Sequence, residues 1–490
     1  MSDNTLEIGQ VRVGWLYPGE VKEGAGIPAT LVREGHRVQA LIPVEGWRSS
    51  NPAARWGTEG IAFDDDPERT EYQYEVPGNM YFIDNHGMVL LIGCRDSGFK
   101  KKFISVFQSL GGILQKISVE AAVFSSRAYN TNSFNGYRTE IENLSQWFQM
   151  NTIKTRPVCE EVDGAYRVKS VETKASSAGE ILIDESRGLK FKSDFTVVPN
   201  SSSTKVVYES HDVLESYRDE TIPFIKGMKE HDAIRDLLMI SSWSVHKFVS
   251  IVVSRDNDRG DFNAIAWRNV ISERWETTKN IDVDNKEFIF TYNDIEPDGV
   301  RKWLEISEKY PRALNPILAT IRWDNGTVEN ELFNLCSGVE ALGRYIYQES
   351  PDESLGGGKN GKIYLHNALQ NIINQIPKGI LPYVKKFENS RNGKVVNSLP
   401  DWADKINNSY NSVKHYGDEE INYDNIFESI DLLRIIIVSW VGTRLGGKPE
   451  AIQSGLLNKN YKFEKHLPPL DDAGYVIEKQ EPEQRSESAE

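Results

Sequence analysis

The period of the hydrophobic pattern changes along the chain, and this change constrains the fold more than any other feature. In the first half, apolar residues recur at every second position, as at Val11, Val13, Trp15 and Tyr17, which is the period of a half-buried strand. Between Thr327 and Gln348 they recur every three or four positions, which is the period of one helix face. The sequence therefore predicts a β-rich first part and a helical second part.

Further short apolar runs, bounded by Gly, Asp or Asn turns, predict more strands in the first part. These runs span 37–46, 79–85, 88–94, 205–208, 248–253 and 288–292. Many short strands separated by turn signals are typical of a sandwich or barrel. We therefore expect a sandwich-like β domain over residues 1–294, followed by a helical connector over 295–326.

Four amphipathic segments predict a helical bundle over residues 327–446. Their apolar stripes fall within 327–348, 365–376, 402–413 and 430–440. The remaining residues, 447–490, form a C-terminal tail. We expect this tail to be disordered from about Pro468, because acids outnumber bases there and Pro, Gln and Ser are frequent. The expected fold class is thus α+β and multidomain.

Composition limits the partners of this chain. With 57 basic and 72 acidic side chains the net charge is -15, which argues against nonspecific coating of nucleic acid but leaves room for a local basic site. The 3 cysteines are far apart and form no CxxC pair, so neither a zinc ribbon nor a disulfide framework is indicated. We expect no metal and no cofactor.

The termini and the most apolar stretch predict a cytoplasmic protein with no membrane partner. The first ten residues lack the basic start and apolar run of a signal peptide. The longest apolar stretch, Leu432 to Val441, is short and is interrupted by Arg434, so it cannot cross a bilayer.

The sharpest polar motif is at the end of the third predicted helix. Asn411 and His415 are one helical turn apart, roughly opposite the apolar stripe, and Lys414 is adjacent. An imidazole titrates near neutrality and can deprotonate a hydroxyl, and RNA supplies its own 2′-hydroxyl as nucleophile. The alternative is a surface histidine near a helix C-terminus, with Gly417 as the C-cap.

Two glycine- and lysine-containing loops precede this motif in the sequence. The loop before it holds a basic cluster that could bind phosphate, and the alternative is an ordinary solvated loop. The cluster consists of Lys378, Lys385, Lys386, Arg391 and Lys394, opposed by Glu388. Residues 356–363 imitate a nucleotide-binding P-loop, but Ile363 replaces the Ser or Thr that would hold magnesium, so we interpret them as a flexible loop.

Several landmarks, in this order, resemble the ApeA family of bacterial anti-phage defence proteins. They are the opening segment with Pro28-Ala29-Thr30-Leu31, and then MVLLIGC, IENLSQWF, FTYNDIEPDGVRKWLEI and ENELFNLCSGVEALGRYIY. The resemblance implies a β-rich N-terminal domain joined to a C-terminal HEPN domain. HEPN domains are helical bundles that commonly dimerise, and many are metal-independent ribonucleases with a motif of Arg, a polar residue and His.

The resemblance implies that Asn411 and His415 are the polar and histidine positions of this motif. Tyr410 stands where the family has arginine, and Lys414 or Arg391 could supply the positive charge instead. The expected function is a defence effector that cleaves RNA to 2′,3′-cyclic phosphate ends and causes abortive infection. The expected catalytic residues are His415, Asn411 and Lys414, and the expected RNA-binding residues are Arg391, Lys385, Lys386, Lys394 and Tyr410.

The expected partners are RNA, a second copy of the chain bound through the bundle, and a phage-derived trigger at the N-terminal domain. Because Tyr410 departs from the family motif, the alternative is a non-catalytic HEPN protein that dimerises or binds RNA, with a β domain that senses a ligand or a protein.

Overall fold

The structure is a computed structural model, and it separates into two compact units that we describe one at a time. It describes residues 4–45, 51–59, 74–103, 111–125, 132–150, 152–162, 165–177, 179–199, 206–260, 263–274, 287–323, 326–350, 363–377, 380, 399–414 and 422–458. Unit 1 consists of Met1–Glu142, Thr152–His231 and Lys247–Glu276. Unit 2 consists of Asn143–Asn151, Asp232–His246 and Thr277–Glu490.

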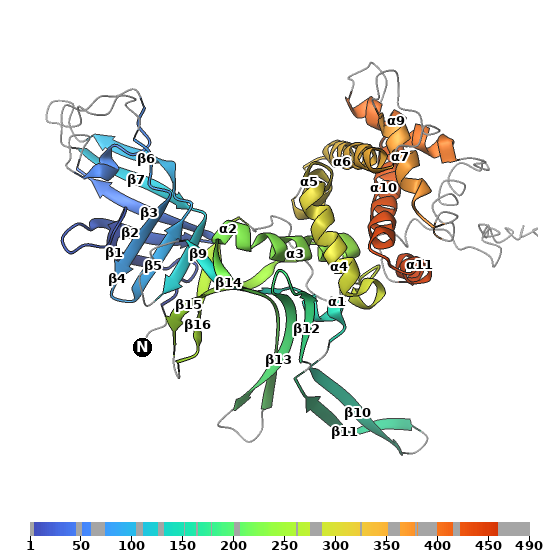
Figure 1. Cartoon of the computed structure of the whole chain (residues 1–490), viewed down its shortest axis with the longest axis horizontal. Helices are drawn as coiled ribbons and strands as arrows, with labels where there is room; N and C mark the ends of the chain where they lie inside the picture. Colours follow the sequence, from blue (N-terminus) through green and yellow to red (C-terminus); the bar gives the residue numbers. More distant parts are fainter. Residues whose placement is uncertain are drawn as a thin grey trace, which may run out of the picture. The chain divides into compact units, whose positions relative to one another are not determined.

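Unit 1 contains the strands of the described residues, most of which are labelled in Figure 1. They are β1 (Val11–Tyr17), β2 (Ile27–Glu34), β3 (Arg37–Val44), β4 (Asn79–Asp84), β5 (Gly87–Ile92), β6 (Arg95–Phe103), β7 (Gly111–Val119), β8 (Ala121–Ser125), β9 (Ser133–Ile141), β10 (Ile153–Val162), β11 (Ala165–Ala175), β12 (Gly179–Asp184), β13 (Leu189–Pro199), β14 (Val206–Pro223), β15 (Phe248–Arg259) and β16 (Ile265–Ser272). A short 3-10 helix, η1 (Pro52–Ala54), and the helix α2 (Phe224–Gly227) also belong to it.

Within the described residues, the strands form one 14-stranded sheet and one 2-stranded sheet. The larger sheet has the order β12-β13-β14-β9-β15-β16-β8-β5-β4-β1-β2-β3-β7-β6, and β10 and β11 form the smaller one. Inward-facing side chains of β1 to β5, β7 and β8 build one apolar core, and side chains of β5, β8, β9, β15 and β16 contribute to a second. The predicted β-rich first part is confirmed, with β3, β4, β5, β14 and β15 at predicted runs.

Strand β1 exists as predicted, but its apolar stripe faces solvent. Val13 is 73% exposed, whereas Arg12 and Leu16 are buried on the opposite side. Alternation fixes the strand period but does not say which face the core covers. The interpretation of Val11, Val13 and Trp15 as the buried half of the strand is therefore wrong.

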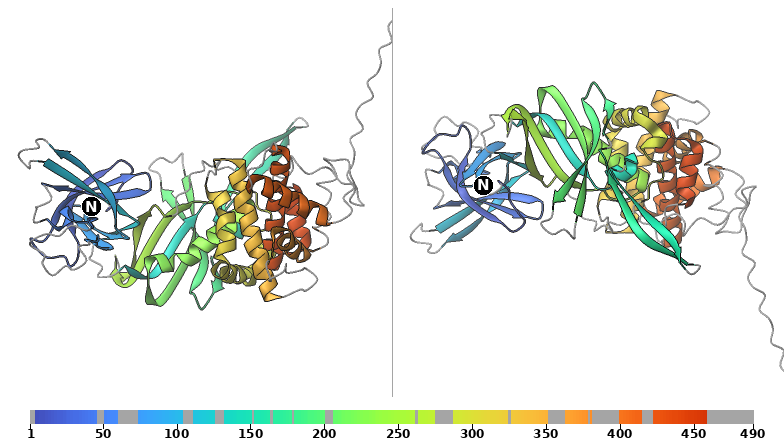
Figure 2. Two further views of the ribbon diagram at one scale, coloured as in Figure 1. Left: turned by 90° about the horizontal axis from the view of Figure 1, so that it is seen from above. Right: turned by 90° about the horizontal axis from the view of Figure 1, so that it is seen from below.

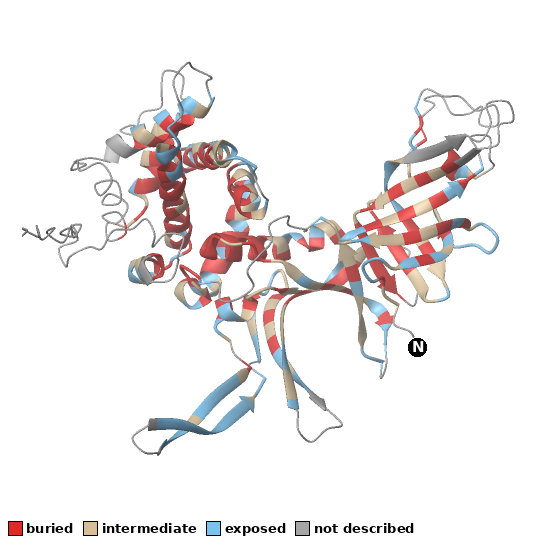
Figure 3. Ribbon diagram, turned by 180° about the vertical axis from the view of Figure 1, so that it is seen from behind, coloured by how far each residue is buried: buried red, intermediate tan, exposed pale blue. Residues whose placement is uncertain are grey.

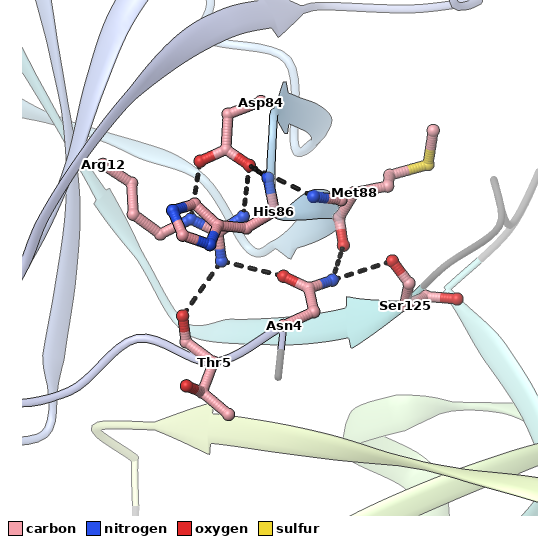
Figure 4. Close-up of polar contacts among 8 residues, drawn as sticks. Asn4, Thr5, Arg12, Asp84, His86, Met88 and Ser125 are labelled. Carbon is pink, nitrogen blue, oxygen red and sulfur yellow. Dashed lines mark hydrogen bonds and ion pairs between the residues drawn. The ribbon is translucent and has the colours of Figure 1, made fainter. Parts of the chain in front are cut away.

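The buried Arg12 is held by a network of hydrogen bonds, shown in Figure 4. Its Nε and Nη2 donate to the two carboxylate oxygens of Asp84 at 2.7 and 2.6 Å, and its Nη1 donates to the Asn4 side chain at 2.8 Å. Asn4 in turn donates to the carbonyls of Met88 and Ser125. A buried guanidinium needs such partners, and the network ties the N-terminal segment to β4, β5 and β8.

The predicted strand at 288–292 is wrong, because this segment leads into a helix. Thr291 precedes α4, and its backbone N–H donates to the Asp294 carboxylate at 2.7 Å, which satisfies one of the free N–H groups at the helix start. The carbonyl of Phe290 accepts a hydrogen bond from the Trp147 indole at 3.1 Å rather than from a neighbouring strand. The apolar run is buried, but as a connection between elements.

Unit 2 is helical, which confirms the predicted bundle. Its helices are α1 (Leu144–Phe148), most of α3 (Lys229–Ser242), α4 (Tyr292–Lys309), α5 (Pro311–Arg322), α6 (Val328–Glu349), α7 (Leu365–Asn374), α9 (Leu399–Lys414), α10 (Tyr423–Arg444) and α11 (Pro449–Asn458). The four predicted bundle helices correspond to α6, α7, α9 and α10, which contact one another. Figure 2 shows these helices, from yellow to red, lying side by side.

Helix α10 is the central helix of the bundle. Residues Ile435 to Gly442 are all buried, so the helix lacks a solvent-facing side there, as the red ribbon in Figure 3 shows. A helix that is apolar all round is enclosed by its neighbours. No helix in the described part of the chain has both the length and the apolar character needed to cross a bilayer. The predicted disordered tail lies outside the described residues.

Candidate functional site in the helical bundle

Helix α9 presents the candidate motif at its C-terminal end. Ala403, Ile406 and Tyr410 follow the 3–4 spacing of one helix face and are buried, whereas Asn411 and Lys414 are exposed. The apolar face therefore anchors the helix and leaves the polar side chains of its last turn accessible. His415 is the next residue in the sequence.

Polar contacts with α10 fix the position of α9. The hydroxyl of Ser429 lies 3.1 Å from the hydroxyl of Ser409 and donates to the Asn425 carbonyl at 2.7 Å. One turn earlier on α9, the ammonium of Lys405 pairs with the carboxylate of Glu428, and both side chains are largely buried. A buried charge is tolerated only when it is paired, so this ion pair resists sliding of α9 along α10.

Tyr410 occupies the arginine position of the motif as a packed aromatic residue. It is 6% exposed, and its ring lies against Phe333 of α6 with centroids 5.7 Å apart. The Nζ of Lys414 lies 5.4 Å from the centre of the Tyr410 ring, which is within the range of a cation–π interaction. A positive charge is thus held one helical turn beyond the position of the family arginine.

The structure brings together only part of the predicted site. It places Asn411 and Lys414 on the exposed end of α9 and Tyr410 beneath Lys414. The other predicted site residues, His415, Arg391, Lys385, Lys386 and Lys394, lie outside the described residues. The P-loop-like segment lies outside them too, except for Ile363.

A histidine–carboxylate pair that sequence reasoning missed also lies on α9. Nδ1 of His366, on α7, is 2.9 Å from Oδ1 of Asp404. Asp404 and Asn411 are two helical turns apart and so share one face of α9. The contact connects α7 to α9. No spacing within the sequence links residues 366 and 404, because the pair forms between two helices.

Two other histidines are excluded as candidates by their surroundings. His231 is fully buried in unit 1, and burial lowers its pKa to about 3, so the ring is neutral at physiological pH. His246 in unit 2 is also buried and stacks on Phe288 with ring centroids 5.5 Å apart. Neither imidazole reaches solvent, so neither can act on a substrate.

The described residues contain no group of three or more His, Cys, Asp or Glu side chains that could hold a metal ion. The thiol of Cys336 faces the bundle interior, where burial raises its pKa well above the usual range and a nearby Glu340 adds to the effect. A thiol in that state is a packing group, because the reactive form is the thiolate.

The chain is thus a two-part protein, with a β-rich unit and a helical bundle that carries a polar motif at the end of one helix. A family model of the ApeA N-terminal domain 1 matches residues 60–304, and a model of the Apea-like HEPN domain matches residues 333–451. The chain therefore belongs to the ApeA family, as its sequence landmarks predicted. No curated protein and no solved structure gave a match.

The second match includes the whole of α9 and α10 and most of α6, so the candidate motif lies within the HEPN domain. HEPN domains in general bind RNA and dimerise. The match therefore supports two of the expected partners, RNA and a second copy of the chain.

Proposed function

We propose that this chain is an anti-phage defence effector whose HEPN domain cleaves RNA without a metal ion. The observation that supports it best is the exposed last turn of α9, where Asn411 and Lys414 reach solvent and His415 follows directly. Polar groups fixed at the end of a buried helix are pre-organised, and pre-organised donors are what stabilise charge in a transition state.

The proposed reaction uses the ribose as its own nucleophile. The imidazole of His415 removes the proton of the 2′-hydroxyl, and the 2′-oxygen forms a bond to the adjacent phosphorus as the bond to the 5′-oxygen breaks. An imidazolium returns a proton to the leaving 5′-oxygen. The products are a 2′,3′-cyclic phosphate and a 5′-hydroxyl.

The other motif residues act on the phosphate. The side-chain amide of Asn411 donates to a non-bridging oxygen and positions it, and Lys414 balances the charge that develops there. Resting over the Tyr410 ring limits the freedom of the lysine ammonium, so Tyr410 contributes by placing Lys414. Lys385, Lys386, Arg391 and Lys394 supply further cations for the RNA backbone.

The N-terminal β domain supplies the control in this proposal. It binds a phage-derived trigger and releases the activity of the HEPN domain, so that an infected cell stops growing before phage are produced. Two copies pair through their bundles, so that the two His415 residues share one groove.

Incubation of the purified full chain with total RNA and EDTA, in the presence of an extract of phage-infected cells that supplies the trigger, tests the proposal. The wild type should cut RNA in EDTA and leave ends that carry cyclic phosphate. His415→Ala should abolish cutting, and Asn411→Ala should slow it by about a hundredfold, as for loss of one transition-state donor. Equal cleavage by wild type and His415→Ala would contradict the assignment of the catalytic residue.

A second candidate function is a non-catalytic HEPN module that binds RNA or dimerises. It is favoured by the burial of Tyr410, because a packed ring at the arginine position cannot itself bind a phosphate. Tight RNA binding without cleavage, also in extracts of phage-infected cells that contain the trigger, would establish this candidate in place of the nuclease.

A further inference from the structure

Strands β10 and β11 form a hairpin that is a separate 2-stranded sheet. The strands are antiparallel and span about 33 Å at about 3.3 Å per residue. Nearly every side chain of the hairpin that the structure describes is exposed or half-exposed, and Figure 3 shows the ribbon in pale blue. A two-stranded hairpin in water is only marginally stable on its own. Because its side chains are exposed, they do not serve to pack a core.

The cross-strand register separates the side chains into two faces. One face carries the pairs Lys154 with Lys174, Arg156 with Glu172, and Glu160 with Arg167, and between the last two the uncharged pair Val158 with Ser170. Lys169 joins this face, because its Nζ lies 2.8 Å from the Glu160 carboxylate. We call this the charged face. The opposite face carries the uncharged residues Ile153, Thr155, Pro157, Cys159, Tyr166, Val168, Val171, Thr173 and Ala175, together with Glu161.

The charged face holds a surplus of cations. Lys154 and Lys174 are directly opposite each other, and like charges in that position destabilise a hairpin. In the described part of the chain, no carboxylate lies within ion-pair distance of Lys154, Arg156, Arg167 or Lys174. In a chain of net charge -15, these four cations make the charged face a local positive surface.

We propose that the charged face of this hairpin binds the phosphate backbone of RNA. A polyanion bound along the hairpin would attract both Lys154 and Lys174 and so offset the repulsion between them. Exposed Lys and Arg side chains are the usual contacts to phosphates. The choice of RNA as the polyanion rests on the proposed ribonuclease function. The hairpin is thus a substrate-holding arm in unit 1, separate from the basic residues of the HEPN domain.

The test measures RNA affinity of the full chain in the His415→Ala background, so that RNA stays intact. A labelled single-stranded oligouridine is titrated over a series of salt concentrations. Lys154→Gln, Arg156→Gln and Lys174→Gln together should weaken binding about tenfold or more at low salt and make the salt slope shallower by about 2. Lys154→Arg with Lys174→Arg should bind as the parent does.

A matched control removes the same charge elsewhere. Lys22→Gln, Lys226→Gln and Lys302→Gln change three exposed lysines and should leave the affinity nearly unchanged. An equal loss in this control, or no loss in the hairpin triple variant, would overturn the proposal. Unfolding temperatures of both triple variants check that the fold is intact.

A variant of the uncharged face tests which face of the hairpin binds RNA. Tyr166 is 79% exposed and Val168 is 62% exposed, which would also suit an apolar protein surface. Tyr166→Ser with Val168→Ser should keep RNA affinity if the charged face binds RNA. If this variant loses RNA affinity and the charged-face variant does not, the charged face is not the binding surface.

Failure of this proposal and failure of the ribonuclease proposal give different results. If the wild type cleaves RNA and the hairpin triple variant binds RNA as tightly as the parent, the hairpin proposal is wrong and the ribonuclease proposal stands. If the wild type does not cleave RNA but the hairpin triple variant binds RNA more weakly than the parent, the ribonuclease proposal is wrong and the hairpin remains an RNA-binding arm.

Discussion

The imidazole of His231 lies between two hydroxyl groups in unit 1. Nδ1 is 2.9 Å from the Thr139 hydroxyl and Nε2 is 3.0 Å from the Ser216 hydroxyl. Hydroxyls can both donate and accept, so they suit the neutral ring, which has one donor and one acceptor nitrogen. Burial disfavours the charged ring, and nearby Arg218 adds to this, so the pKa falls from 6.5 to about 3.

This shift predicts acid sensitivity. The folded pKa is lower than the unfolded one, so the stabilisation is complete above pH 6.5 and is lost as pH falls from 6.5 toward about 3. In that window the unfolded chain binds a proton on His231 and the folded chain does not. The free energy of unfolding should therefore fall by about 1.4 kcal/mol for each unit by which the pH is lowered. Urea unfolding of wild type and His231→Gln checks it, and equal pH slopes for the two would contradict the prediction.

Single residues of the candidate site differ in how far the sequence alone could place them. The exposure of Asn411 followed from its position on the helical wheel, opposite the apolar stripe. Tyr410 has the spacing of the apolar stripe that contains Ile406, so its burial was also within reach of the sequence. The pairing of His366 with Asp404 was not, because contacts between helices depend on how the helices pack.

Tyr410 contributes to the attachment of α9 to α6, and this gives a prediction for the element. Tyr410→Ala removes a ring that contacts Phe333 and should lower the free energy of unfolding of unit 2 by about 3–5 kcal/mol. Tyr410→Phe keeps the ring and the contact with Lys414, so it should unfold within about 0.5 kcal/mol of wild type. Denaturant unfolding of the full chain, followed by helical circular dichroism, compares them, and similar losses for both variants would count against this role of the ring.

The strands and helices could largely be predicted, but not the faces they bury. In β1 the alternation gave the right element, whereas a buried Arg12 with Asp84 as its partner occupies the side that sequence reasoning assigned to solvent. The run at 288–292 has strand composition but is followed by Thr291 and Asp294, which start a helix. Helix α3 was missed because its 14 residues stand among strands and carry several buried polar groups, including Arg235 and Asp236.

At the scale of the whole molecule, the proposed function requires two copies of the chain. If each cleavage site uses one His415 from each copy, then a dimer with a single His415→Ala subunit is inactive. Mixing and re-equilibrating wild type with increasing amounts of the variant should then reduce activity with the square of the wild-type fraction. A linear decrease would mean that one copy suffices for catalysis. Mixing with a variant that cannot dimerise serves as the control, because it dilutes the wild type without forming mixed pairs and so leaves the activity per wild-type chain unchanged.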